Sequence, residues 1–363
     1  MELRYDNRAE AEHPWPLLSP QNSLIVLLFV AVVFFFLLDL VLGSVKIPFG
    51  SVIEIVLGRG SDNEAWEKIV TYIRVPKALT AVIAGAALAV SGLQMQTLFR
   101  NPLAGPSVLG ISAGASLGVA MVMLASGAAA NAFAIRQLGL GGSWLIVVAS
   151  TLGAAFVLLI VLAIAVRIKD NIVLLIVGIM VGNITISLIS IWQYFSEPEQ
   201  IQDYLIWTFG SLGGVLGSQL YVLAIVVAVG LLLSFAASKS LNVMLLGENY
   251  ARSLGMSTLY VRVTVIAATS LLAGSVTGFC GPIGFIGIAV PHLTRSILNT
   301  SDHRFLMPSS CLVGAILMLV CDIIAQMPGS QTTLPINAVT ALIGSPVVIW
   351  VIMKNRNLKS SFA

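Results

Sequence analysis

Long apolar runs separated by short polar breaks are the feature that most restricts how this chain can fold. Of its 363 residues, 58% are hydrophobic and only 10% are charged, whereas soluble globular proteins carry about 25% charged residues. A helix needs roughly 20 apolar residues to cross the hydrocarbon core of a bilayer. The pattern therefore predicts an all-α polytopic membrane protein in contact with membrane lipid, with about ten transmembrane helices. The expected spans are 24–43, 78–98, 106–125, 144–166, 172–194, 219–237, 260–280, 283–298, 307–326 and 336–353.

These runs form one membrane domain over residues 24–353, between a polar N-terminal segment, 1–23, and a basic tail, 354–363. No small-residue cleavage pattern follows the first run, so we expect an uncleaved span rather than a secretory signal. Ten spans place both termini on one side of the membrane. With cytoplasmic termini, the inner segments hold thirteen of the nineteen basic residues, the bias expected in the inner (cytoplasmic) membrane. Five of the six outer ones lie in or beside the first outer loop, 44–77.

Glycine inside the apolar runs indicates closely packed helices, because small residues let membrane helices approach one another. Ala84-Gly85 is followed by Gly92, and Ala273-Gly274 is followed by Gly281 at the same separation. If the chain consists of two halves of five spans each, the odd number makes this weak repeat inverted in the membrane. Inverted repeats are a common transporter architecture.

The stretch 281–291 combines glycine with proline and interrupts the eighth apolar run. Gly281, Pro282, Gly284 and Pro291 predict a broken or unwound helix there. Such a backbone is tolerated in a membrane only where it is buried in protein or lines a cavity. We expect these four residues to have a structural role.

No pattern in the sequence indicates that the chain supplies its own energy. None of the seven lysines follows a glycine, so the Gly-Lys-Ser/Thr phosphate-binding loop is absent. Ionisable residues deep within spans would mark an ion-coupled carrier, but Asp39 and Asp322 lie near span ends and are interpreted as packing residues, and His292 as structural. The cysteines lack metal-binding spacing, and a net charge of +3 does not indicate a nucleic-acid partner. We expect a non-catalytic subunit driven by a partner.

A polar island at Leu241–Met256, within a cytoplasmic element expected over 239–258, is the place where such a partner could bind. Ser240 is expected to cap a short helix that Gly247 interrupts. Glu248 would begin a second short helix, where its negative charge suits the positive end of the helix dipole.

The second short helix carries its own recognition features. Glu248 and Arg252 form an acid-before-base pair one turn apart, and Gly255 suits a left-handed C-cap. Ala251 and Leu254 are expected to share a face, one small and one protruding, that fits a groove in another protein. An ordered loop without a partner is the alternative interpretation of the same residues.

These and other stretches together resemble the motifs of a known family. Gly247-Glu248, Ala251, Leu254 and Gly255 look like the cytoplasmic coupling motif of ABC importer permeases. The other matching stretches are Arg74-Val75-Pro76-Lys77; Asn101–Pro106 with Leu109-Gly110 and Gly114-Ala115; Gly281–Gly287 with Val290-Pro291-His292, Arg295 and Asp302-His303-Arg304; and Leu334-Pro335, Val339-Thr340 and Gly344-Ser345-Pro346. In these residues the chain is most similar to the FecCD/BtuC-type permeases, which import ferric siderophores, haem and cobalamin.

The resemblance implies a BtuC-like homodimer with one translocation path at its interface. Two ABC ATPase subunits would bind on the cytoplasmic side, and a periplasmic or lipid-anchored substrate-binding protein would bind outside. ATP and Mg²⁺ would be held by the ATPases, and this chain would hold no cofactor. The residues that would couple to the ATPase are Gly247, Glu248, Ala251, Arg252, Leu254 and Gly255.

The resemblance also implies roles at both ends of the path. Arg74 and Lys77 match positions that pair with acidic residues of the binding protein. Gln326 stands where the family often has a basic residue, which implies a reduced set of outer ion pairs. The residues that match the cytoplasmic gate are Asn101, Leu103 and Asn171.

The implied function is transport of a metal chelate by alternating access, as the permease subunit of an ATP-driven importer. The breadth of the iron-chelate class favours a ferric siderophore or haem. A cobalamin permease of the same family and an ion-coupled secondary transporter are the alternatives.

Overall fold

The computed structural model describes residues 20–61, 63–124, 140–168, 170–327, 329 and 332–354, and these residues form helices and loops without a strand. Most of the polar segment 1–23 and of the basic tail 354–363 lies outside them. Seven helices are long and apolar enough to span a membrane. They are α1 (Pro20–Val41), α4 (Val75–Leu98), α7 (Leu140–Arg167), α8 (Asn171–Phe195), α10 (Ser218–Ala236), α13 (Thr258–Cys280) and α15 (His303–Ala325).

Two apolar helices are shorter than these seven, α5 (Ile111–Met123) and α14 (Ile286–Leu298), and a third, α16 (Ile336–Lys354), counts as a shorter apolar helix over Ile336–Trp350. Each of the ten expected ranges therefore coincides with an apolar helix. The all-helical membrane fold is confirmed, whereas ten complete spans stay a prediction because only seven helices are long and apolar enough to span a membrane.

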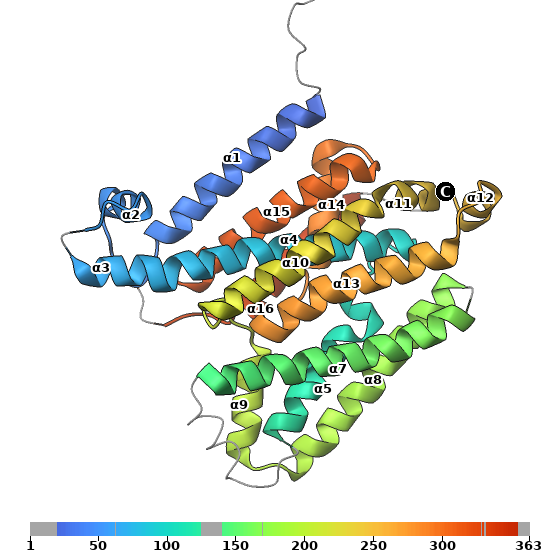
Figure 1. Cartoon of the computed structure of the whole chain (residues 1–363), viewed down its shortest axis with the longest axis horizontal. Coiled ribbons are helices and arrows are strands. Elements are labelled where there is room, and N and C mark those ends of the chain that lie inside the picture. The colour runs from blue at the N-terminus through green and yellow to red at the C-terminus, as the bar shows by residue number, and fades with distance from the viewer. Residues whose placement is uncertain are drawn as a thin grey trace, which may run out of the picture.

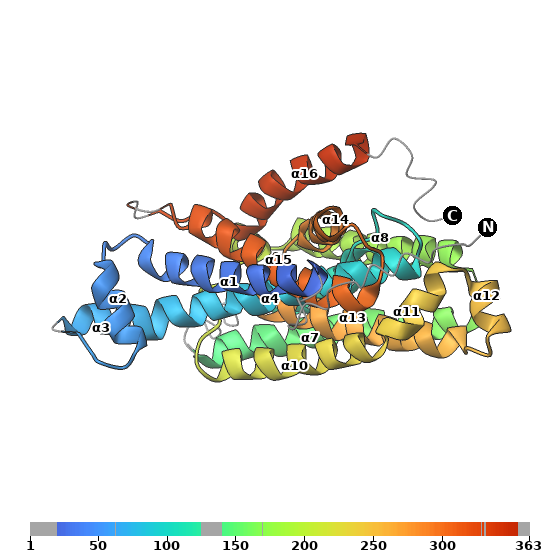
Figure 2. The same cartoon turned by 90° about the horizontal axis from the view of Figure 1, so that it is seen from above.

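Short helices connect the long ones. They are α2 (Phe49–Val56), α3 (Glu64–Ile69), the π-helical turn η1 (Val70–Arg74), the 3₁₀ turn η2 (Pro106–Leu109), α9 (Pro198–Thr208), α11 (Ser238–Leu245) and α12 (Glu248–Ser253). Helices α2 and α3 lie at one end of the molecule, and α11 and α12 lie at the other (Figures 1 and 2). The two ends of the bundle are therefore built by different short helices.

The expected outer loop 44–77 is largely helical. The Asn63 side chain accepts hydrogen bonds from the backbone amides of Ala65 and Trp66, at 3.0 and 3.4 Å, and so caps α3. From Glu64 the backbone then runs through η1 into α4 without a break as far as Leu98. The second span is thus longer than expected.

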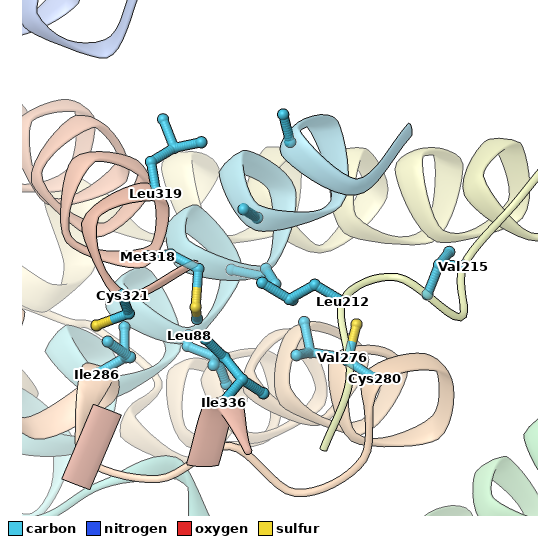
Figure 3. Packing of buried hydrophobic residues seen from close by; sticks show 14 of the residues in the cluster. Leu88, Leu212, Val215, Val276, Cys280, Ile286, Met318, Leu319, Cys321 and Ile336 are labelled. Atoms are coloured by element: carbon cyan, nitrogen blue, oxygen red, sulfur yellow. The ribbon is translucent and has the colours of Figure 1, made fainter. Parts of the chain in front are cut away.

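Helix α4 is the centre of the bundle and packs against α1, α10, α13, α14 and α15 (Figure 1). Leu88 of α4 lies in the buried core with Val276 of α13, Ile286 of α14 and Met318 of α15 (Figure 3). By contrast, most of the side chains of α1 and α8 are not buried within this chain. A helix that is apolar all round and yet exposed needs lipid or another subunit around it.

The glycines of α4 permit its close packing. A Cβ on Gly85 would overlap the backbone of Gly314, and one on Gly92 would overlap the backbone of Gly287. The expectation of small-residue packing is confirmed at these positions. In α13, Gly274 meets only side-chain atoms and Gly281 lies beyond the helix end, so the two glycine motifs differ in role and the inverted repeat stays a prediction.

The broken segment is confined to its first five residues. Gly281 ends α13 in a left-handed conformation with φ of 76°, and Pro282 follows it in the non-helical stretch before α14. The backbone amide of Gly284 donates to the Asn337 side chain at 3.0 Å, which ties this stretch to α16. Pro291 lies inside α14 and does not end it.

Candidate functional site

Two polar clusters lie at opposite ends of the bundle. We name the first the α12 junction, which consists of Asn171, Glu248, Arg252 and Arg262. We name the second the aspartate cluster, which consists of Asp39, Arg74, Lys77, Asp322 and Gln326. Both combine carboxylates with basic groups, and each joins segments that are far apart in the sequence.

Two glycines define the limits of α12. Gly247 precedes it with φ of 120°, and Glu248 is its first residue. At the other end, Gly255 has φ of 80°; its amide donates to the Arg252 carbonyl, and the Met256 amide donates to the Ala251 carbonyl. This pair of bonds is the Schellman arrangement. The expected helix start at Glu248 and left-handed cap at Gly255 are confirmed.

Two local expectations for this element are wrong. Helix α11 begins at Ser238 without a side-chain cap, so Ser240 lies inside the helix instead of capping it. Ala251 and Leu254 do not share an exposed face, because Ala251 is fully buried whereas Leu254 is 60% exposed. Ala251 packs instead in the buried cluster with Met244.

Three apolar side chains of the element are largely exposed, and we name them together the ridge. Leu246, Tyr250 and Leu254 lie four residues apart and are 66%, 51% and 60% exposed. Of these, only Leu254 was singled out from the sequence. The spacing could have revealed Tyr250, since side chains four apart lie on one face of a helix. Leu246 precedes Gly247, which separates α11 from α12, so helical spacing does not relate it to the other two.

The Glu248 carboxylate is the centre of the α12 junction. One of its oxygens accepts hydrogen bonds from the Asn171 side-chain amide at 2.5 Å and from Arg262 at 3.3 Å. The other accepts from Arg252 at 3.1 Å, which confirms the expected pair within α12. The Glu248 side chain is 19% exposed and that of Arg262 only 4%, so their charges compensate each other in a largely dry environment.

The partners of Glu248 also bind the ends of two other helices. The Asn171 amide donates to the Leu98 carbonyl at the end of α4, at 2.9 Å. Arg262 donates to the Ile168 carbonyl just beyond α7, at 2.6 Å. The junction therefore connects α12 to the ends of α4 and α7 and to the start of α8.

The loop after α4 contains the other two predicted gate residues. The Asn101 side chain accepts a hydrogen bond from the Leu103 amide at 2.9 Å and so shapes its own turn. The Leu103 side chain is 47% exposed. The neighbouring Arg100 donates to the Met244 carbonyl at 3.0 Å, which binds this loop to α11.

A pocket of about 970 Å³ lies between this loop, the start of α8 and the segment 246–252. Asn101, Asn171 and Glu248 all line it, while Leu103 does not. The structure therefore brings two of the three predicted gate residues together with the predicted coupling element.

Sequence reasoning missed the contacts that hold α11 in place. Asn242 donates to Asp302 at 2.6 Å and accepts from the His303 amide at 2.9 Å. The His303 ring in turn contacts the Thr97 hydroxyl at 2.8 Å. Helix α11 is thus bonded to α15 and, through His303, to α4. The Asp-His-Arg motif marked two of these residues, but nothing in the sequence indicated Asn242.

Arg74 and Lys77, the residues predicted to face a binding protein, have internal partners at the α2–α3 end. Arg74 is buried and donates to the carbonyls of Leu40 at 2.7 Å and Val45 at 2.5 Å. Lys77 forms an ion pair with Asp322 at 2.9 Å. Neither presents a free charge to solvent in this structure.

The aspartate cluster is completed by two residues with other expected roles. Gln326 donates to Asp39 at 2.8 Å and to Asp322 at 3.0 Å, so it bridges two buried carboxylates. Gln326 therefore has a bonding role inside the bundle that was not expected. The packing interpretation of Asp39 and Asp322 agrees with this arrangement. Within the described residues, no group of three or more His, Cys, Asp or Glu side chains could hold a metal ion.

The helical bundle and its polar element define a multi-pass membrane protein of the permease class. The chain matches the FecCD transport family over residues 30–354. It is 37% identical to a vitamin B12 import system permease protein, BtuC, from Citrobacter koseri, over 80% of this chain and 84% of the relative. It is also 37% identical to the BtuC protein of an Escherichia coli strain, over 80% and 85%. The chain therefore belongs to the FecCD family of transport permease subunits.

The structural comparison agrees. A chain of a metal-chelate type ABC transporter, solved in an inward-facing conformation, superposes with a TM-score of 0.78 at 25% identity. The match covers 92% of this chain and 99% of that chain. The resemblance read from the sequence is thereby confirmed at the level of family and fold.

Proposed function

We propose that this chain is the membrane-spanning subunit of an ATP-driven importer for an organic metal chelate. Two copies would form one path that opens alternately to each side of the membrane. The observation that carries the proposal is that the exposed ridge of Leu246, Tyr250 and Leu254 stands on an element bonded to the gate segments. Membership of the FecCD family supports it.

The partner at the α12 end would be an ABC ATPase, which holds ATP and Mg²⁺. An apolar ridge on a short helix suits insertion into a groove of another protein. The α12 end would then be cytoplasmic, and this orientation agrees with the excess of basic residues in the inner segments. Both termini of the chain would lie on the cytoplasmic side of the inner membrane.

The α2–α3 end would face the substrate-binding protein. Because Arg74 and Lys77 have internal partners, other basic groups are better candidates for this contact. Lys46 and Arg59 are exposed there, whereas the exposed Lys68 is paired with Glu64. We propose that Lys46 and Arg59 form the positive surface that meets acidic residues of the binding protein.

The substrate we propose first is a ferric siderophore or haem, and the second is cobalamin. The names of the curated relatives favour the second. A pocket of about 430 Å³ between α5 and α8 is lined by uncharged polar groups, including Ser116, Asn183 and Gln193, with no charged side chain among its described lining residues. Such groups suit a chelate with amide or hydroxyl groups at its periphery.

Reconstitution in vesicles tests the proposal. The chain is combined with the ATPase and the binding protein encoded beside it, and uptake of ferric hydroxamate, haem and cobalamin is measured with and without ATP. We expect accumulation of one chelate that requires ATP and the binding protein. Uptake that needs no ATPase but collapses with the proton gradient would show a secondary transporter instead. Uptake of cobalamin alone would select the second substrate.

A further inference from the structure

We propose that Glu248 is a positioning residue that joins α12 to the start of α8, so that α12 and the gate segments move as one unit. The proposal rests on the proposed function and names the side chain that transmits motion within it. The ridge is the surface that the ATPase would move, and Glu248 would carry that movement into the bundle.

Helix α12 on its own is poorly suited to transmit a displacement. It has six residues, and isolated helices of this length are marginal in water. Gly247 and Gly255 flank it with positive φ, and a Cβ on Gly255 would meet nothing within 4 Å. Without a link to the rest of the bundle, the helix would rotate about these two glycines and the displacement would be lost.

Glu248 provides that link through Asn171. The Asn171 side-chain amide has two hydrogens, and it donates to the Leu98 carbonyl and to Glu248. The same amide group therefore bonds the end of α4 and the start of α12. Asp170 caps α8 by accepting a hydrogen bond from the Ile172 amide at 2.7 Å. Asn171 is the first residue of this capped helix, so a displacement of Asn171 moves the first turn of α8.

Arg262 makes this link resistant to breaking. Its guanidinium is almost completely buried and donates both to Glu248 and to the Ile168 carbonyl. Charged hydrogen bonds are stronger than neutral ones, so the bond between Arg262 and Glu248 strengthens the link that Asn171 makes. Displacement of α12 is thus transferred both to Ile168, just beyond α7, and to Asn171, at the start of α8.

The neighbouring helix α11 provides the contrast. It is bonded to α15 and α4 through Asn242 and His303, and α15 is one of the long helices of the bundle. Helix α11 is thus bonded to α15 and α4, whereas α12 is bonded through Asn171 and Arg262 to the start of α8 and to the ends of α4 and α7. The bend between them is expected at Gly247.

The test measures the coupling ratio, the number of chelate molecules imported per ATP hydrolysed, in the reconstituted complex. In E248A we expect the complex to assemble and ATP hydrolysis to stay within about twofold of wild type, while the ratio falls at least about tenfold. E248Q keeps an acceptor oxygen for Asn171 and Arg262, so its ratio should stay within about threefold of wild type. The matched control is N249A, the exposed neighbour on the same helix.

A double-mutant cycle sharpens this test. If Asn171 and Glu248 act as one link, the ratio of N171A with E248A should equal that of the worse single variant instead of the product of both losses. Spin labels at Ser253 and Ile172 should keep a constant separation through the ATP cycle in wild type and separate in E248A.

Each other outcome has a definite meaning. A wild-type ratio in assembled E248A, multiplicative losses in the cycle, or failure of E248A to bind the ATPase would overturn the positioning role. A wild-type complex that imports no chelate would instead count against the proposed function. The two failures are therefore distinguishable.

Discussion

The two polar clusters contain the same kinds of interaction, ion pairs and amide hydrogen bonds, but they connect different parts of the molecule. In the α12 junction, one carboxylate binds two arginines and an amide, and it attaches a six-residue helix between glycines. In the aspartate cluster, one carboxylate pairs with a lysine, and one amide donates to both carboxylates, between the long helices α1, α4 and α15. The first joins a hinged part to the bundle, whereas the second locks rigid helices together.

The role of a buried ion pair therefore depends on the helices that carry the two charges. Breaking the aspartate cluster should cost stability, because none of its three long helices can move away to relieve an unpaired charge. Breaking the α12 junction should cost coupling, because it removes the bonds that attach a six-residue helix to the start of α8 and to the ends of α4 and α7. Three substitutions extend this comparison: the largest effect is expected in the aspartate cluster, a smaller one at the ridge, and the smallest at the attachment of α11.

The largest effect is expected for Lys77→Met. Asp322 and Asp39 are each 2% exposed, and the substitution leaves both carboxylates without the lysine. Removing one partner of a buried ion pair costs about 3–5 kcal/mol, so we expect a loss of this size in the free energy of unfolding, measured by denaturant titration in detergent.

Two further variants test whether an unpaired buried charge causes this loss of stability. Lys68→Met removes an exposed ion pair with Glu64 and should leave stability unchanged, since exposed pairs contribute little. Lys77→Met combined with Asp322→Asn should recover much of the loss. If the combined variant is no more stable than Lys77→Met alone, an unpaired charge is not the cause.

A smaller effect, on transport instead of stability, is expected for Leu254→Arg. The side chain is 60% exposed, so the free energy of unfolding should not change. A charge in an apolar contact at a partner's groove typically costs more than about 1.4 kcal/mol, or tenfold. ATP-driven uptake in vesicles should fall at least about tenfold, while Leu254→Met should retain it. Unchanged uptake in Leu254→Arg would remove the ridge from the coupling surface.

The smallest effect is expected for Asp302→Ala, at the attachment of α11. The Asp302 side chain accepts hydrogen bonds from the Arg304 amide and from Asn242, and these bonds lower the pKa of Asp302 below its ordinary value of 3.8. The bond from the Arg304 amide caps α15, and losing this cap should lower the free energy of unfolding by about 1 kcal/mol at neutral pH. The matched variant Asp302→Asn keeps a capping oxygen and should lose less.

The pH dependence of that loss has a definite sign. A carboxyl whose pKa is lower in the folded state stabilises the fold above its unfolded pKa, and it loses this contribution as pH falls through the folded value. The difference between wild type and Asp302→Ala should therefore be complete at neutral pH and shrink below about 3.8. A difference that is independent of pH would show that the charge on Asp302 does not contribute.

Features that depend on neighbouring residues could be predicted from the sequence. The apolar runs predicted all ten apolar helices, because hydrophobic length alone decides which segments suit a bilayer. Glu248 and Gly255 marked the limits of α12, since dipole and capping preferences act within one turn. The family motifs added partners and candidate site residues, although none of them distinguished a buried Arg74 from an exposed one.

Only the tertiary structure decided which polar groups meet. Asn171 and Glu248 are 77 residues apart, Thr97 and His303 are 206 apart, and Gln326 and Asp39 are 287 apart. No local preference encodes such pairs, because they depend on how the long helices pack around α4. The same packing buried Ala251 and left Leu254 exposed, although the two lie one helical turn apart. The sequence determined which segments form helices. Tertiary packing determined which charged side chains pair between the long helices and which attach α12 to the bundle.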